Sequence, residues 1–157
     1  MNRKHHYKVN LVWTGNQGTG TSGYTSYGRD HEINVQGKPT LPASSDPIFK
    51  GNENRYNPEE LLVASLSSCH MLWYLHLCSE NGVIITDYVE NATGTMEETS
   101  DGGGAFTEVI LNPVITVLNA NMMDLAYSLH GKANQMCFIA KSCNFPVHHK
   151  PECKARE

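Results

Sequence analysis

The stretch Asn57-Pro58-Glu59-Glu60-Leu61-Leu62-Val63-Ala64-Ser65-Leu66-Ser67-Ser68-Cys69-His70 decides the fold, because it opens the longest helix that the sequence predicts. Asn57 is a typical helix N-cap, and Pro58 suits the first helical position, where an N–H would be unpaired. Glu59 and Glu60 place negative charge at the positive end of the helix dipole. Apolar residues recur at helical spacing up to Gly82, a residue typical of helix ends. We therefore expect a buried central helix over residues 57–81. Its expected core face carries Leu62, Leu66, Cys69, Trp73 and Leu77.

Before this helix, the sequence predicts a β-hairpin and a long loop. Alternating apolar and polar residues indicate strands over residues 7–14 and 24–35. The segment between them contains Gly18–Gly23, which matches the pattern G-x-G-x-x-G. A dinucleotide-binding loop needs a helix directly after that pattern, and β-forming residues follow instead. We interpret the glycines as a hairpin connection. Residues 41–56, rich in Pro, Asn and Ser, are expected to form a long ordered loop that could line a site.

After the central helix, the pattern predicts two more strands and a second helix. The strands cover residues 83–96 and 106–118, and Pro113 indicates a sheet edge or a bulge in the second. The second helix covers residues 121–136, with Met122, Leu125, Leu129 and Ala133 on one face. Residues 145–147 are expected to form a short strand at most. With no repeat and no linker, the fold class is α+β, in a single domain over residues 1–157.

Composition and charge exclude several classes of protein. The chain has 157 residues, 39% of them hydrophobic, and a net charge of −4, which is not the profile of a disordered chain. It has no long basic run, so we expect no nucleic-acid partner. The N-terminal residues alternate in polarity, so no signal peptide is predicted. Ser65, Ser67, Ser68 and His70 interrupt the longest apolar stretch, and we therefore expect no membrane span and a cytoplasmic location.

The cysteines pose the main question about function. There are five of them, an odd number that does not suggest a disulfide framework. Each could be a buried apolar residue, a metal ligand or a redox group. Three features favour chemistry at Cys69: small polar residues precede it, the loop before its helix carries Lys50 and Arg55, and Glu59 and Glu60 begin the helix. A nearby cation raises the thiolate fraction of a cysteine, and a carboxylate can hold that cation.

A structural zinc site is the competing interpretation. Cys143, His148, His149 and Cys153 cluster near the C-terminus, but their spacing fits no compact zinc template. We expect them to be solvated side chains of a tail. His70 and His76 do not share a helix face as two metal ligands would.

The stretch over residues 57–70 resembles the N-P-E-E-L-x-x-A-x-x-x-x-C signature of the OsmC/Ohr family, the osmotically inducible protein C and organic hydroperoxide resistance proteins. The segment Cys137-Phe138-Ile139-Ala140-Lys141-Ser142 is similar to the second-cysteine segment of that family. The separation of the two cysteines and the order of the elements also match over nearly the whole chain. The resemblance implies antiparallel sheets wrapped around a long central helix in an intertwined homodimer.

The resemblance also implies a thiol-dependent peroxidase that reduces organic hydroperoxides. Cys69 would be the thiolate that is oxidised to a sulfenic acid, and Cys137 would resolve it to a disulfide. The resemblance also implies a small dithiol, such as a lipoyl group, as the reductant. No cofactor and no metal are expected, because sulfur carries the electrons. Cys78, Cys143 and Cys153 have no role in this scheme.

Three basic residues are candidates for the cation that stabilises the Cys69 thiolate. Glu59 matches the carboxylate of the family motif, which holds a catalytic arginine. Phe49-Lys50 stands where the loop arginine is expected, and Arg29 and Arg55 are the alternatives; we select Arg29. Phe138 also stands where relatives often have Pro, so the chain resembles a divergent OsmC-like branch.

A non-enzymatic role is the alternative function. In that interpretation the protein binds a small molecule or senses redox state through an apolar pocket at the dimer interface. Trp73, Tyr74 and Phe138 would line that pocket.

Overall fold

The computed structural model describes residues 3–156, which form two compact units. The N-terminal unit covers residues 1–61 and the C-terminal unit covers residues 62–157. The boundary falls inside the long helix α1 (Pro58–Glu80). The single domain over residues 1–157 stays a prediction.

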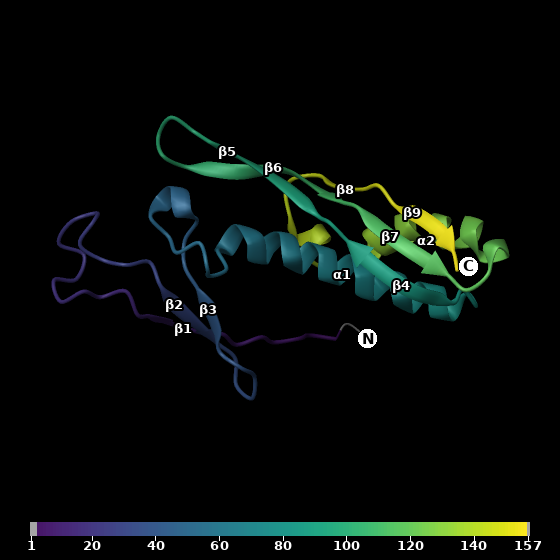
Figure 1. The fold of residues 1–157 in the computed structure, drawn as a ribbon, viewed down its shortest axis with the longest axis horizontal. Helices are drawn as coiled ribbons and strands as arrows, with labels where there is room; N and C mark the ends of the chain where they lie inside the picture. The colour runs from purple at the N-terminus through teal and green to yellow at the C-terminus, as the bar shows by residue number, and fades with distance from the viewer. Residues whose placement is uncertain (1–2, 157) are drawn as a thin grey trace. The chain divides into compact units, whose positions relative to one another are not determined.

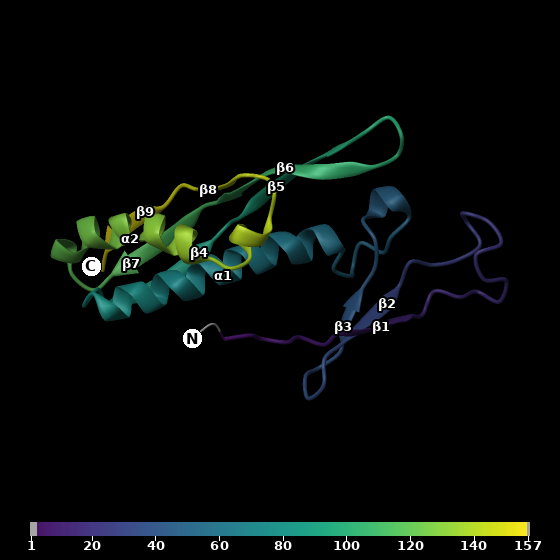
Figure 2. The same ribbon diagram turned by 180° about the vertical axis from the view of Figure 1, so that it is seen from behind.

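The N-terminal unit is built on a three-stranded antiparallel sheet in the order β1-β2-β3 (Figure 2). Its strands are β1 (Asn10–Trp13), β2 (His31–Asn34) and β3 (Leu41–Ala43). The predicted hairpin connection is confirmed, since β1 pairs with β2 and the glycine-rich segment lies between them. Gly18 and Gly20 adopt positive φ there, of 102° and 57°, which favours glycine. Both strands are shorter than predicted. The predicted loop over residues 41–56 contains β3 and the short 3₁₀ helix η1 (Pro47–Phe49).

The first turn of α1 is closed by a reciprocal cap. The side chain of Asn57 accepts a hydrogen bond from the backbone N–H of Glu60 at 2.8 Å. The Glu60 carboxylate in turn accepts from the backbone N–H of Asn57 at 3.1 Å. Two otherwise unpaired donors are satisfied in this way. The helix ends at Glu80, and Gly82 follows with a φ of 71°, so the predicted bounds are confirmed.

The C-terminal unit contains two separate three-stranded sheets, each with its own central strand. The central strands are β6 (Gly104–Leu111) and β7 (Pro113–Val117). They pair antiparallel with β5 (Thr93–Glu98) and β4 (Ile85–Glu90), and parallel with β8 (Val147–His149) and β9 (Glu152–Ala155) (Figure 1).

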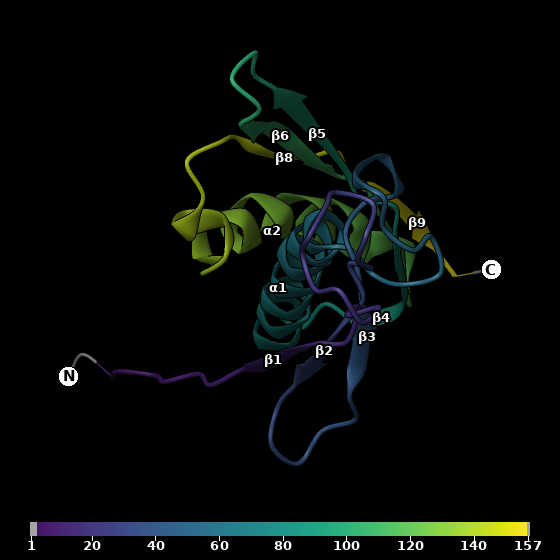
Figure 3. The ribbon, with the colours of Figure 1, turned by 90° about the vertical axis from the view of Figure 1, so that its left-hand side faces the viewer.

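Helices α1 and α2 (Met123–Met136) lie against one face of the β4-β7-β9 sheet (Figure 3). Alternate residues of β7 point to that face, and Ile115 and Val117 are fully buried there. Short 3₁₀ helices, η2 (Ala120–Met122) and η3 (Ala140–Ser142), precede and follow α2. The main buried cluster contains Tyr74 and Cys78 from α1, Val83, Ile115 and Val117 from the sheet side, and Ala126, Leu129 and Ala133 from α2.

Two predictions about the sheet are wrong. Pro113 was expected at an edge or a bulge, but it begins the central strand β7. The first residue of a strand tolerates the missing N–H. The C-terminal residues were expected to be a solvated tail with a short strand at most. Instead they form β8 and β9, which pair with the edges of β6 and β7. These hydrogen bonds join segments that are far apart in the sequence, so local residue patterns do not predict them.

The buried faces of both helices agree with the prediction only in part, since Leu66, Leu129 and Ala133 are buried as predicted. On α1 the fully buried residues are Leu66, His70, Tyr74 and Cys78, so two of the four side chains are polar rings. The face predicted through Cys69 is only half buried. On α2 the buried residues include His130, whereas Leu125 is 43% exposed. Helical spacing alone does not distinguish two adjacent faces of a mostly apolar helix.

Length and apolar composition alone would allow α1 to span a membrane, despite its serines and histidines. The core helix of a globular domain meets the same criterion. The absence of a membrane span stays a prediction.

Replacing Asn57 by Ala should lower the free energy of unfolding by about 1 kcal/mol, because it removes the side chain that caps α1. Urea unfolding followed by circular dichroism measures the loss. Asn54→Ala is the matched control, since Asn54 is exposed and lies outside the helix. Equal stability of the two variants would contradict a capping role for Asn57.

Candidate active site

The two cysteines of the family-like motifs lie beside each other in the C-terminal unit. Cys69 is half buried on α1, and Cys137 is buried at the end of α2 with 1% of its surface exposed. Burial and the neighbouring Cys69 thiol raise the pKa of Cys137 to about 11. The backbone N–H of Ala140 donates to the Cys137 sulfur at 3.4 Å and partly opposes that rise. The fold therefore brings together one accessible thiol and one buried, protonated thiol.

Because Cys69 and Cys137 differ in burial, their sulfurs can take part in different reactions. A thiol with a pKa near 11 stays protonated at neutral pH and is a poor nucleophile. Cys69 is the one of the two that a reagent from solvent can reach. A buried thiol beside it can attack only a sulfur that is already activated.

The other three cysteines are placed as apolar core residues. Cys78 belongs to the main buried cluster, and Cys153 on β9 packs against that cluster. Cys143 packs against a second cluster around Leu66 and donates to the carbonyl of Ile139 at 3.4 Å. Burial raises the pKa of all three thiols, which lowers their thiolate fraction at neutral pH.

Aromatic side chains flank the cysteine pair. Trp73 lies one helical turn after Cys69, and Phe138 directly follows Cys137. Their rings meet edge to face at 5.4 Å between centroids, and Phe138 is 67% exposed. Tyr74, which the alternative function placed in a pocket lining, is fully buried. Trp73 and Phe138 thus present apolar surface next to the thiols.

Arg29, in the N-terminal unit, forms no ion pair with a carboxylate within residues 3–156. Its guanidinium lies over the rings of Tyr24 and Tyr27, at 4.4 and 4.2 Å from their centroids. One terminal nitrogen donates to the carbonyl of Tyr27 at 2.6 Å, and the other is buried without a partner. A buried donor without a partner is costly in free energy, so this nitrogen is available to an incoming acceptor.

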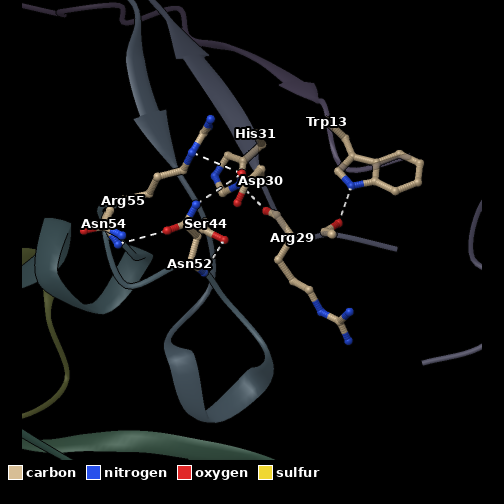
Figure 4. Close-up of polar contacts among 9 residues, drawn as sticks. Trp13, Arg29, Asp30, His31, Ser44, Asn52, Asn54 and Arg55 are labelled. Carbon is tan, nitrogen blue, oxygen red and sulfur yellow. Dashed lines mark hydrogen bonds and ion pairs between the residues drawn. The ribbon is translucent and has the colours of Figure 1, made fainter. Parts of the chain in front are cut away.

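The other two cations predicted as candidates are placed differently. Arg55 forms an ion pair with Asp30, at 3.2 Å from its Nε to the carboxylate. Asn52 also approaches that carboxylate at 3.5 Å, while the guanidinium of Arg29 points away from it (Figure 4). Lys50 is exposed and holds a left-handed backbone after η1.

The two acidic residues at the start of α1 have separate positions. Glu60 uses its carboxylate in the helix cap. Glu59 is half buried and takes part in no ion pair or side-chain hydrogen bond within residues 3–156. Its carboxylate is therefore the free one of the two, in the N-terminal unit that also holds Arg29.

Sequence reasoning missed a buried histidine pair next to the cysteines. His70 and His130 are both fully buried, and Nε2 of His70 lies 3.0 Å from Nδ1 of His130. Burial lowers the pKa of His70 to about 4 and that of His130 to about 3, helped by the neighbouring histidines. His130 shares a face of α2 with Ala126 and Ala133, so its helical spacing from these small apolar residues could have predicted that it is buried.

The zinc hypothesis receives no support from the geometry. His149 packs its ring 5.8 Å from that of His70, and Cys153 packs against the core. Between residues 3 and 156, no group of three or more His, Cys, Asp or Glu side chains is placed to hold a metal ion. The expectation that these residues form a solvated tail is also wrong.

A family model described as OsmC-like protein matches residues 51–152, which include both cysteines of the candidate site. The chain belongs to the OsmC-like protein family. The predicted resemblance is confirmed by this match.

Solved structures of OsmC-like proteins share the fold. An OsmC-like protein of unknown function from Vibrio cholerae has 26% sequence identity and a TM-score of 0.82, over 94% of this chain and 99% of that chain. An organic hydroperoxide resistance protein OsmC from Legionella pneumophila has 18% identity and a TM-score of 0.69, over 98% and 99%. OhrB of Bacillus subtilis, an organic hydroperoxide resistance protein, has 20% identity and a TM-score of 0.62, over 96% and 98%. A search of curated protein sequences finds no match.

The histidine pair of this OsmC-like chain should make its stability fall in mild acid. Both rings are neutral when folded, with pKa values lowered from 6.5 to about 4 and about 3, so only the unfolded chain binds these protons as the pH falls below 6.5. The free energy of unfolding should decline by up to about 1.4 kcal/mol per pH unit for each histidine between pH 6.5 and 4.

Urea unfolding at pH 7.0, 6.0, 5.0 and 4.5 measures this decline. The double variant His70→Gln/His130→Asn lacks both titrations and should show a shallower slope. Equal slopes in the two proteins would contradict a neutral buried pair.

Proposed function

We propose that this protein is a thiol-dependent peroxidase that reduces organic hydroperoxides. The observation that supports this most strongly is the pair formed by an accessible Cys69 and a buried Cys137. Family membership, and the names of solved relatives with the same fold, agree with a role in hydroperoxide resistance.

The first step is an attack by the Cys69 thiolate on the terminal oxygen of the hydroperoxide. The O–O bond breaks, Cys69 becomes a sulfenic acid, and the organic oxygen leaves as an alcohol after taking up a proton. Trp73 and Phe138 offer apolar contact to the organic group, which favours organic hydroperoxides over hydrogen peroxide.

The second step joins the two cysteines. The Cys137 sulfur attacks the Cys69 sulfur, the S–O bond breaks, and the thiol proton leaves with the hydroxyl group as water. Because Cys137 is protonated and buried, it does not compete for the peroxide in the first step. A small dithiol such as a lipoyl group then reduces the disulfide and is itself oxidised to a disulfide.

Arg29 is the cation that we assign to the Cys69 thiolate, and Glu59 is the carboxylate that holds it. Arg29 carries an unpartnered buried nitrogen, whereas Arg55 is already paired with Asp30. Glu59 carries the free carboxylate at the start of α1, because Glu60 caps the helix. The functional unit in this proposal is a cytoplasmic homodimer that binds neither nucleic acid nor membrane.

The cysteine roles predict distinct products after one equivalent of cumene hydroperoxide. Cys69→Ser should abolish peroxide consumption, and Cys137→Ser should leave a sulfenic acid that dimedone traps. Intact mass and peptide mapping identify the products, and Cys143→Ser is the matched control that should behave as wild type. Full activity of Cys69→Ser would contradict the proposal. The protein would then be assigned the binding or redox-sensing role.

The assignment of Arg29 predicts a rate effect confined to the first step. Arg29→Met should slow the single-turnover oxidation of Cys69 at pH 7 by about tenfold or more, because a cation near a thiol raises its thiolate fraction. Stopped-flow measurement with cumene hydroperoxide gives the rate. Arg55→Met is the control and should stay within about twofold of wild type, since its partner is Asp30. The reverse pattern would assign the role to Arg55.

A further inference from the structure

The buried pair His70 and His130 joins the two helices that carry the reactive cysteines. His70 follows Cys69 on α1, and His130 lies on α2, which ends at Cys137. Both rings are fully buried, and the two facing nitrogens lie 3.0 Å apart. The pair is thus a polar contact between α1, which carries Cys69, and α2, which ends at Cys137.

The ring geometry is that of an in-plane hydrogen bond. The planes differ by 6°, and the ring centroids are 5.3 Å apart, which is too far for face-to-face contact at a nitrogen separation of 3.0 Å. One ring donates its N–H and the other accepts with a lone pair. Such a bond fixes direction as well as distance, which apolar packing does not.

The surroundings keep this bond neutral and strong. The Tyr74 ring stacks on His130 at 3.8 Å, and the His149 ring lies 5.8 Å from His70. Within residues 3–156 no carboxylate pairs with either ring to stabilise a charge. The outer ring nitrogens, Nδ1 of His70 and Nε2 of His130, are buried without a partner, so the bond between the two facing nitrogens is the one hydrogen bond that each ring makes among the described residues. In a low-dielectric core such a bond is stronger than in water, and losing it would leave a further buried nitrogen unpaired.

A second contact lies one turn further along the same stripe of α1. The Tyr74 hydroxyl donates to the carbonyl of Ala126 on α2 at 3.1 Å. Two directed hydrogen bonds therefore set how far α2 is shifted along α1 and how it is rotated. Since Cys137 is at the end of α2, these bonds also set its place beside Cys69.

We propose that His70 and His130 are positioning residues for the cysteine pair. Their hydrogen bond holds Cys137 where it can attack the oxidised Cys69, and so it favours the disulfide over a persistent sulfenic acid. This rests on the proposed function, in which the hydroperoxide oxidises Cys69 and water leaves when the disulfide forms. The histidines do not touch the peroxide and take no part in the first step.

The test compares variants that lose the bond with variants that can keep it. His70→Phe and His130→Phe keep an aromatic ring of similar size but cannot form the bond. His70→Gln and His130→Asn each place a polar group near the position of the nitrogen used in the native pair. Val117→Ala destabilises the same buried cluster from the sheet and serves as the control for lost stability alone.

Each protein is reduced, treated with one equivalent of cumene hydroperoxide in the presence of dimedone, and mapped by mass spectrometry. In wild type we expect the Cys69–Cys137 disulfide to dominate. In the two Phe variants the ratio of dimedone adduct to disulfide should rise by about tenfold or more, while the rate of the first oxidation stays within about twofold. The Gln and Asn variants should recover most of the disulfide, and Val117→Ala should match wild type. A rise in Val117→Ala, or none in folded Phe variants, overturns the proposal.

A redox titration in dithiothreitol buffers tests the positioning without any peroxide. The Cys69–Cys137 disulfide should be about tenfold less stable in the Phe variants, which corresponds to about 30 mV. If wild type reacts with no hydroperoxide but the titration still shows this difference, the proposed function fails and the positioning role stands. If wild type reacts normally and the titration shows no difference, only the positioning role fails. Should either Phe variant not fold, the other Phe variant and the two conservative variants decide the outcome.

Discussion

Two hydrogen bonds between buried side chains of α1 and groups on α2 constrain the rest of the C-terminal unit. The buried stripe of α1 includes a histidine ring and a tyrosine hydroxyl, which need partners away from water. His130 and the carbonyl of Ala126 provide those partners, both from α2. The helix pair is therefore held in one register, and the sheet covers it with alternate residues of β7.

That register gives two thiols of the same chain different properties. Cys69 stays half exposed on the flank of α1, whereas the end of α2 carries Cys137 into the interior. Burial keeps Cys137 protonated, and it also raises the pKa of the three remaining cysteines. This difference in solvent access supports the proposed division into an attacking sulfur, Cys69, and a resolving sulfur, Cys137. In the N-terminal unit, Arg55 pairs with Asp30, whereas Arg29 has no carboxylate partner within residues 3–156.

Several features could be predicted because they depend on neighbours in the sequence. The cap of α1 links Asn57 with Glu60, and the end of the helix depends on the backbone freedom of Gly82. The glycine-rich hairpin connection could be predicted for the same reason, because it depends on glycines that follow one another in the sequence. Family membership could also be predicted, because the two cysteine motifs are short continuous segments of the sequence, and the family model that matches residues 51–152 includes both. Strand lengths and the buried faces of the helices were predicted less well, because tertiary packing outweighs local periodicity.

The sequence by itself determined the ends of the central helix, the first hairpin and the two cysteine segments that mark the OsmC-like family. Only the tertiary structure decided that β8 and β9 extend the central strands, that His70 meets His130, and that Cys137 rather than Cys69 is buried. The physical reason is the range of the interactions. Caps and turns are closed by hydrogen bonds within a few residues, whereas burial and side-chain pairing depend on contacts between segments that are far apart in the chain.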